Sequence, residues 1–246
     1  MRSFPVPAWL NLGDKRRSFH WGLGPVLSDF ARAFKKAGLD RLLEENEVEL
    51  FSFDLGPAAL RHQSILPLSP PLGRPAIYRR TEKALKMVRS FYSGPLAAEN
   101  YNFYPTGLYH HVTEPDFMAS YLREFGLGLV LDLAHAAVSA HNTGLKPEVY
   151  FEALPLERTV EIHVSRPWLP AGRGIMAVDD HGAPGEREWR WLNALLEGGR
   201  IPDSAVIFIE YYKDQGKLEA AQACLEQLSA INKKSSENVD KARCRL

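Results

Sequence analysis

Apolar and polar positions divide this chain into two kinds of segment. Short apolar runs predict buried strands at residues 10–12, 48–56, 95–105, 127–136, 158–165 and 204–212. Longer stretches with apolar residues three and four apart predict helices at residues 25–45, 81–94, 113–126, 147–157, 185–199 and 215–234. The Pro-rich segment 62–80 has no periodicity and is expected to be a loop, and residues 235–246 are expected to form a flexible tail.

Strands that alternate with helices indicate βα units and therefore a parallel sheet. We expect the α/β class and a TIM-type (β/α) barrel, formed by one domain over residues 1–234. Six candidate strands are visible where a complete barrel has eight, which leaves open an incomplete barrel or irregular first strands. A doubly wound nucleotide-binding sheet is disfavoured because neither of its glycine-rich phosphate motifs is present.

Composition narrows the class of protein further. The 246 residues carry 30 basic and 30 acidic side chains, so no overall field favours nucleic acid or an anionic membrane as a partner. Two cysteines, Cys224 and Cys244, are too few for a disulfide framework or a thiolate metal site. Because we find neither a membrane span nor a signal peptide, we expect a soluble cytoplasmic protein.

Acidic and imidazole side chains stand where the apolar runs end. A barrel gathers the carboxyl ends of all its strands around one mouth, so side chains far apart in sequence converge there. Ionisable groups buried together must be paired or bound to metal. The seven candidate metal ligands are Glu99, Asp132, His135, His163, Asp179, His181 and Glu210.

Their spacing supports one site. Residues two apart on a strand share a face, so Asp179 and His181 point the same way in the run VDDH (178–181), and Asp180 points elsewhere. Imidazole nitrogens and carboxylate oxygens without thiolate suit iron, manganese or zinc. Seven ligands exceed what one octahedral ion takes, which predicts two or more ions bridged by carboxylates. His20 and Asp54, near the ends of the first strands, are less certain ligands.

Each residue also has a plainer explanation. His163 alone could be a hydrogen-bonded core residue, Glu210 alone could pair with Lys213, and the run from Asp179 to Gly182 could be an ordinary turn. The conjunction at successive strand ends favours metal. Other candidates for orienting ligands or binding substrate are Glu161, Asn142, His141 and Asn100. The pair His110–His111 lies in a loop beside the mouth and could contact substrate or simply be surface.

The motifs AENYNFYP, EPDF, LVLDLAHAAVSAHNTG, YFEALPL, VEIHVS, DDHGAP and VIFIE resemble the multinuclear non-haem iron-dependent oxidative enzymes. This family was long catalogued as a domain of unknown function, and it includes the methanobactin-biosynthesis oxygenase. The resemblance covers about residues 95–214. It implies a TIM-type barrel holding two or three iron ions, with ligand roles for the seven residues above. Many relatives have Asn where this chain has His135. The first 95 residues match poorly.

The resemblance also implies a substrate class, because characterised relatives oxidise cysteine-containing ribosomally made peptides, often with a peptide-binding partner protein. We therefore expect clustered iron that activates dioxygen and oxidises a small-molecule or peptide substrate. A redox-neutral barrel enzyme using manganese, magnesium or zinc, like a sugar isomerase or a phosphodiesterase, is the alternative. A non-enzymatic protein with a degenerate site is the third hypothesis.

Overall fold

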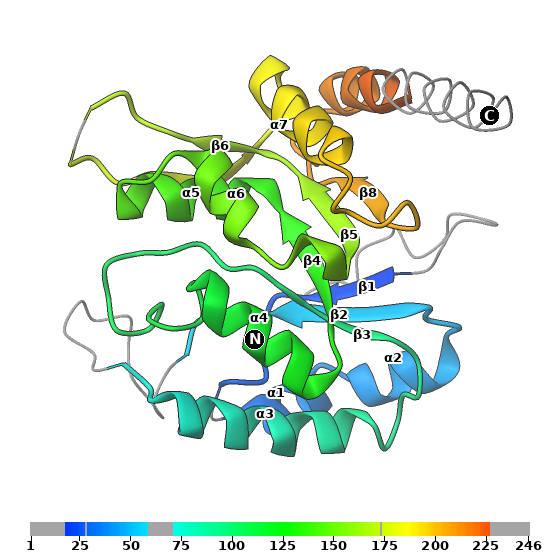
Figure 1. Cartoon of the computed structure of the whole chain (residues 1–246). Coiled ribbons are helices and arrows are strands. Elements are labelled where there is room, and N and C mark those ends of the chain that lie inside the picture. Colours follow the sequence, from blue (N-terminus) through cyan, green and yellow to red (C-terminus); the bar gives the residue numbers. More distant parts are fainter. Residues whose placement is uncertain (1–17, 28, 59–70, 173, 227–246) are drawn as a thin grey trace, which may run out of the picture.

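The computed structural model describes residues 18–27, 29–58, 71–172 and 174–226. The predicted strand at 10–12 and the predicted tail at 235–246 lie outside the described residues. Six parallel strands form one sheet in the order β1-β2-β3-β4-β5-β8 (Figure 1). The strands are β1 (Ser18–Trp21), β2 (Leu50–Asp54), β3 (Leu96–Glu99), β4 (Gly128–Asp132), β5 (Thr159–Val164) and β8 (Val206–Ile209).

The sheet is curled. In a flat sheet, β1 and β5 would be four strand spacings apart, about 19 Å. The rings of His20 on β1 and His163 on β5 have centroids only 5.5 Å apart, so their strands bend toward one another. Among the described residues β1 pairs only with β2 and β8 only with β5, which leaves the wall open on one side. The prediction of a TIM-type barrel is confirmed, and the described strands form only part of one, which is one of the two irregularities that the sequence left open.

Helices connect the strands and lie beside the sheet (Figure 1). Many of their apolar residues are buried in the core. They are α1 (Phe30–Lys36), α2 (Leu39–Glu45), α3 (Arg74–Val88), α4 (Pro115–Phe125), α5 (Leu133–Thr143), α6 (Pro147–Ala153) and α7 (Glu186–Glu197), with a 3-10 turn at Leu156–Arg158 and a last helix at 215–226. The core includes Phe34, Phe51 and Tyr121, all fully buried. Within the described residues, no helix combines the length and apolar character that crossing a bilayer requires.

Several predicted boundaries were wrong for identifiable reasons. The predicted helix 25–45 is two helices, because Gly38 adopts a left-handed φ of 70° between them. The predicted loop 62–80 ends at Arg74, where α3 begins. Pro75 lies in the first turn of this helix, and its missing backbone N–H is tolerated there because N–H groups of the first turn have no acceptor within the helix. The predicted strand 127–136 ends at Asp132, whose carboxylate accepts the backbone N–H of His135 at 2.5 Å and starts α5.

Two further boundaries differ. The predicted helix 147–157 ends at Ala153, and a 3-10 turn follows. The run 178–181 is not a barrel strand: β7 (Val178–Gly182) pairs antiparallel with β6 (Arg166–Trp168) in a separate two-stranded sheet. We call this sheet, together with the described residues between its two strands, the arm. Side chains alternate between faces equally in a barrel strand and in a hairpin, so the sequence pattern did not distinguish them.

Candidate metal centre

Glu99, at the end of β3, lies at the centre of a group of charged side chains. Its Oε1 atom is 3.2 Å from His135 Nδ1 and 3.4 Å from His163 Nδ1. Its Oε2 atom is 3.0 Å from Nε2 of His20. Because these histidines come from α5, β5 and β1, the curl of the sheet is what brings them to one carboxylate.

The first two strands complete one side of this group. His20 Nε2 is 3.1 Å from Asp54 Oδ1, and the Nδ1 atom of the same ring is 3.0 Å from the hydroxyl of Ser52. Both less certain candidates therefore lie with the seven others. Ser52 was not anticipated, although its position two residues before Asp54 on a strand places it on the same face.

The arm supplies the opposite side. Asp179 Oδ2 lies 3.2 Å from His135 Nε2 and 3.0 Å from His181 Nδ1, and His181 Nε2 lies 3.3 Å from Glu210 Oε1. Asp180 points away and pairs with Lys213 at 3.4 Å, as the alternation predicts. His181 has a φ of 45°, a conformation that a residue with a side chain rarely adopts.

All nine predicted ligands are thus in one contiguous group, which we call the mouth cluster: His20, Asp54, Glu99, Asp132, His135, His163, Asp179, His181 and Glu210. It contains two sets of potential ligand atoms, and within each set all the atoms lie within 4.8 Å of one another. One set is Glu99, Asp132, His163 and Glu210, and the other is His20, Asp54 and Glu99. Glu99 belongs to both, so the arrangement suits two cations that share a carboxylate.

Two neighbouring residues orient members of the cluster. Glu161 Oε1 is 2.7 Å from His163 Nε2, which leaves Nδ1 of that ring facing Glu99. The Asn100 amide bonds the backbone of Asp132 in both directions, donating to its carbonyl at 2.9 Å and accepting from its N–H at 2.8 Å. Contacts of this kind would orient metal ligands, which is one of the two roles predicted for Glu161 and Asn100.

His141 and Asn142 lie elsewhere. The Asn142 amide donates to the Phe103 carbonyl and bonds the backbone of Ala177 in both directions, so it joins the β3–α4 loop to the arm. His141 Nε2 is 3.0 Å from the Ile175 carbonyl at the tip of the arm. Neither forms a contact with a mouth-cluster residue among the described interactions. They hold the arm that carries Asp179.

The charge balance of the mouth cluster favours a bound cation. With Glu161 it holds six carboxylates and four histidines, and every ion pair of these carboxylates within the described residues is with a histidine. Within the mouth cluster, five buried side-chain atoms lack a hydrogen bond of acceptable geometry: Glu99 Oε2, Asp132 Oδ2, His163 Nδ1, Asp179 Oδ1 and Glu210 Oε2. Buried polar atoms are rarely left without partners, so these residues fit bound metal.

The pKa values show a disfavoured charge at Asp132 and favourable pairing at Glu99 and His181. Burial raises the pKa of Asp132 to about 7, with the Glu99 and Glu210 carboxylates adding to the effect and His135 opposing it. Hydrogen bonds to Asp179 and Glu210 raise the pKa of His181 to about 10. Although burial acts against it, His20 and His163 hold the pKa of Glu99 well below its usual range. Without metal, protons on the histidines offset part of the negative charge.

Aromatic residues cover the His135 side. The Tyr101 ring stacks on Tyr109 with centroids 5.8 Å apart and lies 5.7 Å from the His135 ring. Tyr109 is buried, and both tyrosines belong to the loop between β3 and α4. This loop therefore shields one edge of the mouth cluster from solvent.

Sequence comparison finds relatives among UPF0276 proteins. A UPF0276 protein of Caulobacter vibrioides is 30% identical over 177 residues, covering 67% of this chain and 62% of its own length. A UPF0276 protein of Pseudomonas aeruginosa is 28% identical over 181 residues, covering 71% of this chain and 56% of its own length. The chain thus spans about three fifths or less of these relatives.

Solved structures share the fold at low identity. A D-tagatose 3-epimerase-like protein superposes with a TM-score of 0.58 at 16% identity, over 91% of this chain and 80% of its own. A xylose isomerase-like TIM barrel protein from Mycobacterium smegmatis, in complex with magnesium, gives 0.55 at 13% identity, over 87% and 73%. The family model described as RiPP precursor modification enzyme MbnB/TglH/ChrH matches residues 32–232. By this match, which spans most of the chain and confirms the expected family, the protein belongs to the MbnB/TglH/ChrH family of RiPP precursor modification enzymes.

Proposed function

We propose that this chain forms the catalytic barrel of an enzyme that uses two or three iron ions in the mouth cluster to oxidise a bound peptide with dioxygen. The observation that carries the proposal is the buried excess of carboxylate at the mouth, with five unbonded polar atoms and no lysine or arginine partner among the described residues. Membership of a family that modifies RiPP precursors supports a peptide substrate, and the family resemblance favours one containing cysteine.

The donor set favours iron over magnesium. Mixed imidazole and carboxylate ligands without thiolate suit iron, manganese or zinc, whereas magnesium and calcium prefer oxygen alone. Four histidines in one cluster therefore weigh against magnesium. Manganese or zinc remains the alternative metal.

Three groups of residues would hold the ions. Glu99 would be shared, with His20 and Asp54 on one side, and with Asp132, His163 and Glu210 on the other. His135, Asp179 and His181 form a further group at the arm. When bound, iron would supply the activation of dioxygen and the removal of hydrogen from the substrate.

The chain's own residues supply geometry and shielding. Glu161 holds Nε2 of His163 and so directs Nδ1 toward Glu99. Asn100 fixes the backbone of Asp132, and the stacked pair Tyr101–Tyr109 limits the access of water to His135. A fixed and partly dry site keeps reactive species from solvent.

The arm offers a surface beside the mouth cluster on which a peptide could lie. Trp168, Ile175, Met176 and Val178 are exposed there, with side chains between 40% and 52% accessible. Val178 shares a face of β7 with Asp180, so this surface lies on the side of the strand opposite Asp179 and His181, and a peptide bound there would have to pass the edge of the arm to reach the metal ligands. A separate peptide-binding partner protein could dock on this surface and present the substrate to the mouth cluster.

A redox-neutral divalent-metal enzyme, like a sugar isomerase or a phosphodiesterase, is the second candidate. Its support is the fold shared with the D-tagatose 3-epimerase-like and xylose isomerase-like proteins. Fold alone does not fix the reaction, and the imidazole-rich donor set favours iron over the magnesium bound in the second of these structures.

Elemental analysis and dioxygen uptake test the proposal. Anaerobically purified protein should contain two or more iron ions per chain and should consume dioxygen when a reductant and a cysteine-containing peptide are added. Asp179→Asn should lose iron and uptake, whereas Asp180→Asn, the adjacent residue paired with Lys213, should keep both. Stoichiometric zinc or manganese with no dioxygen uptake after reconstitution with iron would overturn the assignment.

A further inference from the structure

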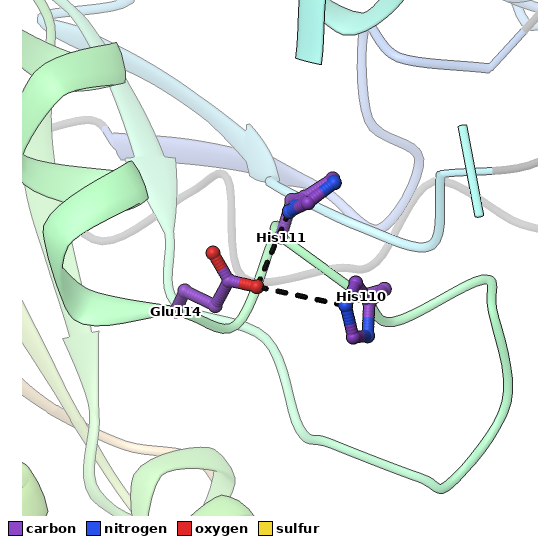
Figure 2. A group of neighbouring side chains, drawn as sticks. All are labelled: His110, His111 and Glu114. Atoms are coloured by element: carbon purple, nitrogen blue, oxygen red, sulfur yellow. Dashed lines mark hydrogen bonds and ion pairs between the residues drawn. The ribbon is translucent and has the colours of Figure 1, made fainter. Parts of the chain in front are cut away.

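A second group of metal-ligating side chains lies in the loop between β3 and α4, outside the mouth cluster. Figure 2 shows His110, His111 and Glu114 there, with both imidazoles turned toward one carboxylate oxygen. Glu114 Oε1 is 3.2 Å from His111 Nδ1 and 3.9 Å from His110 Nε2. We call these three residues the loop cluster.

An unusual backbone turn brings the two histidines together. The Val112 N–H donates to the His110 carbonyl at 2.8 Å, a bond between residues two apart, and His111 between them has a φ of 65°. This is the γ-turn with positive φ, which is rare and strained. It places the rings of the two adjacent histidines 4.9 Å apart. Strained residues of this kind concentrate at ligand sites.

His111 has one counterpart in the part of the chain that the structure describes. The only other residue besides glycine with positive φ there is His181, which belongs to the mouth cluster. In both places the rare conformation aims an imidazole at a carboxylate, at 3.2 Å for His111 and 3.0 Å for His181.

Arg74, in the first turn of α3, orients Glu114. Its Nη2 atom donates to Glu114 Oε2 at 2.5 Å, which leaves Oε1 directed at the histidines. Although burial acts in the opposite direction, Arg74 and His111 hold the pKa of Glu114 below its ordinary value. Arg74 Nε also lies 3.4 Å from His111 Nδ1, the nitrogen that faces Glu114 Oε1 at 3.2 Å.

We propose that His110 Nε2, His111 Nδ1 and Glu114 Oε1 bind one zinc ion. Ligands at about 2.1 Å in a tetrahedron are separated by roughly 3.4 Å, and the observed separations of 3.2 and 3.9 Å bracket this value. All three ligand atoms lie within 4.8 Å of one another, so small side-chain rotations suffice. The exposure of His110 (56%) and Glu114 (37%) leaves the fourth position to water.

The ion would bind more weakly than metal at the mouth. The Arg74 guanidinium repels a cation, and the single carboxylate gives little excess negative charge. Zinc bound to the loop cluster would therefore exchange readily with zinc ions in solution. It would link the β3–α4 loop to the start of α4, and the same loop carries the Tyr101–Tyr109 pair that covers His135.

Calorimetric titration of the full chain, purified with its mouth metal, tests the site with zinc chloride as the probe. We expect one exchangeable zinc in the wild-type protein. Affinity should fall at least tenfold in His110→Ala and in Glu114→Gln, because each removes a ligand. His141→Ala, which alters a histidine outside both clusters, should bind as the wild type does.

A further pair of variants separates this site from the proposed iron centre. Zinc can also enter the mouth that Asp179→Asn empties, so the loop site is measured by difference: Asp179→Asn/His110→Ala should bind one zinc fewer than Asp179→Asn. Circular dichroism confirms that each variant is folded, which is expected because His110 is exposed. Absence of zinc binding in the wild type, or equal affinity in the His110 and Glu114 variants, would overturn the zinc site without bearing on the iron centre.

Discussion

The mouth cluster and the loop cluster use the same side chains in opposite surroundings. At the mouth, Glu99 and Asp132 are almost completely buried, and histidines are the cationic partners of the carboxylates among the described residues. In the loop, Glu114 is 37% exposed and is paired with Arg74. Because buried charge is costly and solvated charge is not, a bound cation would stabilise the first cluster far more than the second.

The difference has a consequence for stability. At the mouth, burial disfavours the charged form of Asp132 in the metal-free chain and raises its pKa, whereas neighbouring histidines offset the charge of Glu99. In the loop cluster, the strain is confined to the backbone of His111. Measurements on metal-free protein can therefore separate a site that depends on its ion from one that only accepts an ion.

The largest effect is expected from Asp132→Asn in metal-free protein. The substitution removes a buried charge near Glu99 and Glu210 while keeping a side chain that can cap α5, so it should stabilise the fold by about 2 kcal/mol at pH 8. The folded pKa of about 7 lies above the unfolded value near 4, so the penalty of the ionised group grows as pH rises between them.

Urea denaturation of chelator-treated wild type and Asp132→Asn, at pH 8 and pH 5, measures this gain. The difference should shrink at pH 5, where Asp132 is protonated in the folded protein. Loss of stability at pH 8 would show that the mouth carboxylates are not under strain.

A smaller effect, about tenfold per pH unit for each proton displaced, is expected for the metal affinity of the mouth cluster. His181 has a pKa of about 10 in the metal-free protein, and the pKa values of His135 and His163 are raised well above the ordinary value. These rings hold protons at neutral pH that a metal must displace, so affinity should rise with pH.

Calorimetry in two buffers of different ionisation enthalpy counts the protons released when metal binds. One or more protons per chain should leave at pH 7. A proton count of zero, or affinity that falls with rising pH between 6 and 8, would contradict the protonated state of the histidines.

The smallest effect is expected in the loop cluster. Arg74→Gln breaks an exposed ion pair with Glu114 and should lower the stability of metal-free protein by less than about 1 kcal/mol. Urea denaturation beside Arg190→Gln, which breaks another exposed pair, with Glu186, provides the matched comparison. A loss of several kcal/mol would mean that the loop cluster supports the fold as the buried contacts do.

Much of the architecture was predictable from the chain. The apolar runs ending in Glu99, Asp132, His163 and Glu210 belong to β3, β4, β5 and β8 as expected, because strand runs buried on both faces are strongly marked in sequence. The identity of the α/β barrel followed from their alternation with helices. Gly38 marks a break between two helices, and Pro75 marks the start of another. Both signals were missed because the pattern was interpreted over whole segments, 25–45 and 62–80.

The residues that gather at the mouth could be predicted from the sequence, but the elements that carry all of them could not. Alternation placed Asp179 and His181 on one face, yet the sequence did not show that β7 belongs to the arm. The loop cluster was seen only as an adjacent pair, His110–His111. Glu114 joins it through the γ-turn at His111, a backbone conformation that nothing in the local sequence predicts.

Sequence alone determined which side chains were available, and on which face of each strand they stand, because that information is local and repeats every two residues. Only the tertiary structure decided that β1 curls toward β5, and that the arm folds back so that Asp179 meets His135. Those distances depend on long-range packing, in which contacts between residues far apart in the chain set the position of every charge.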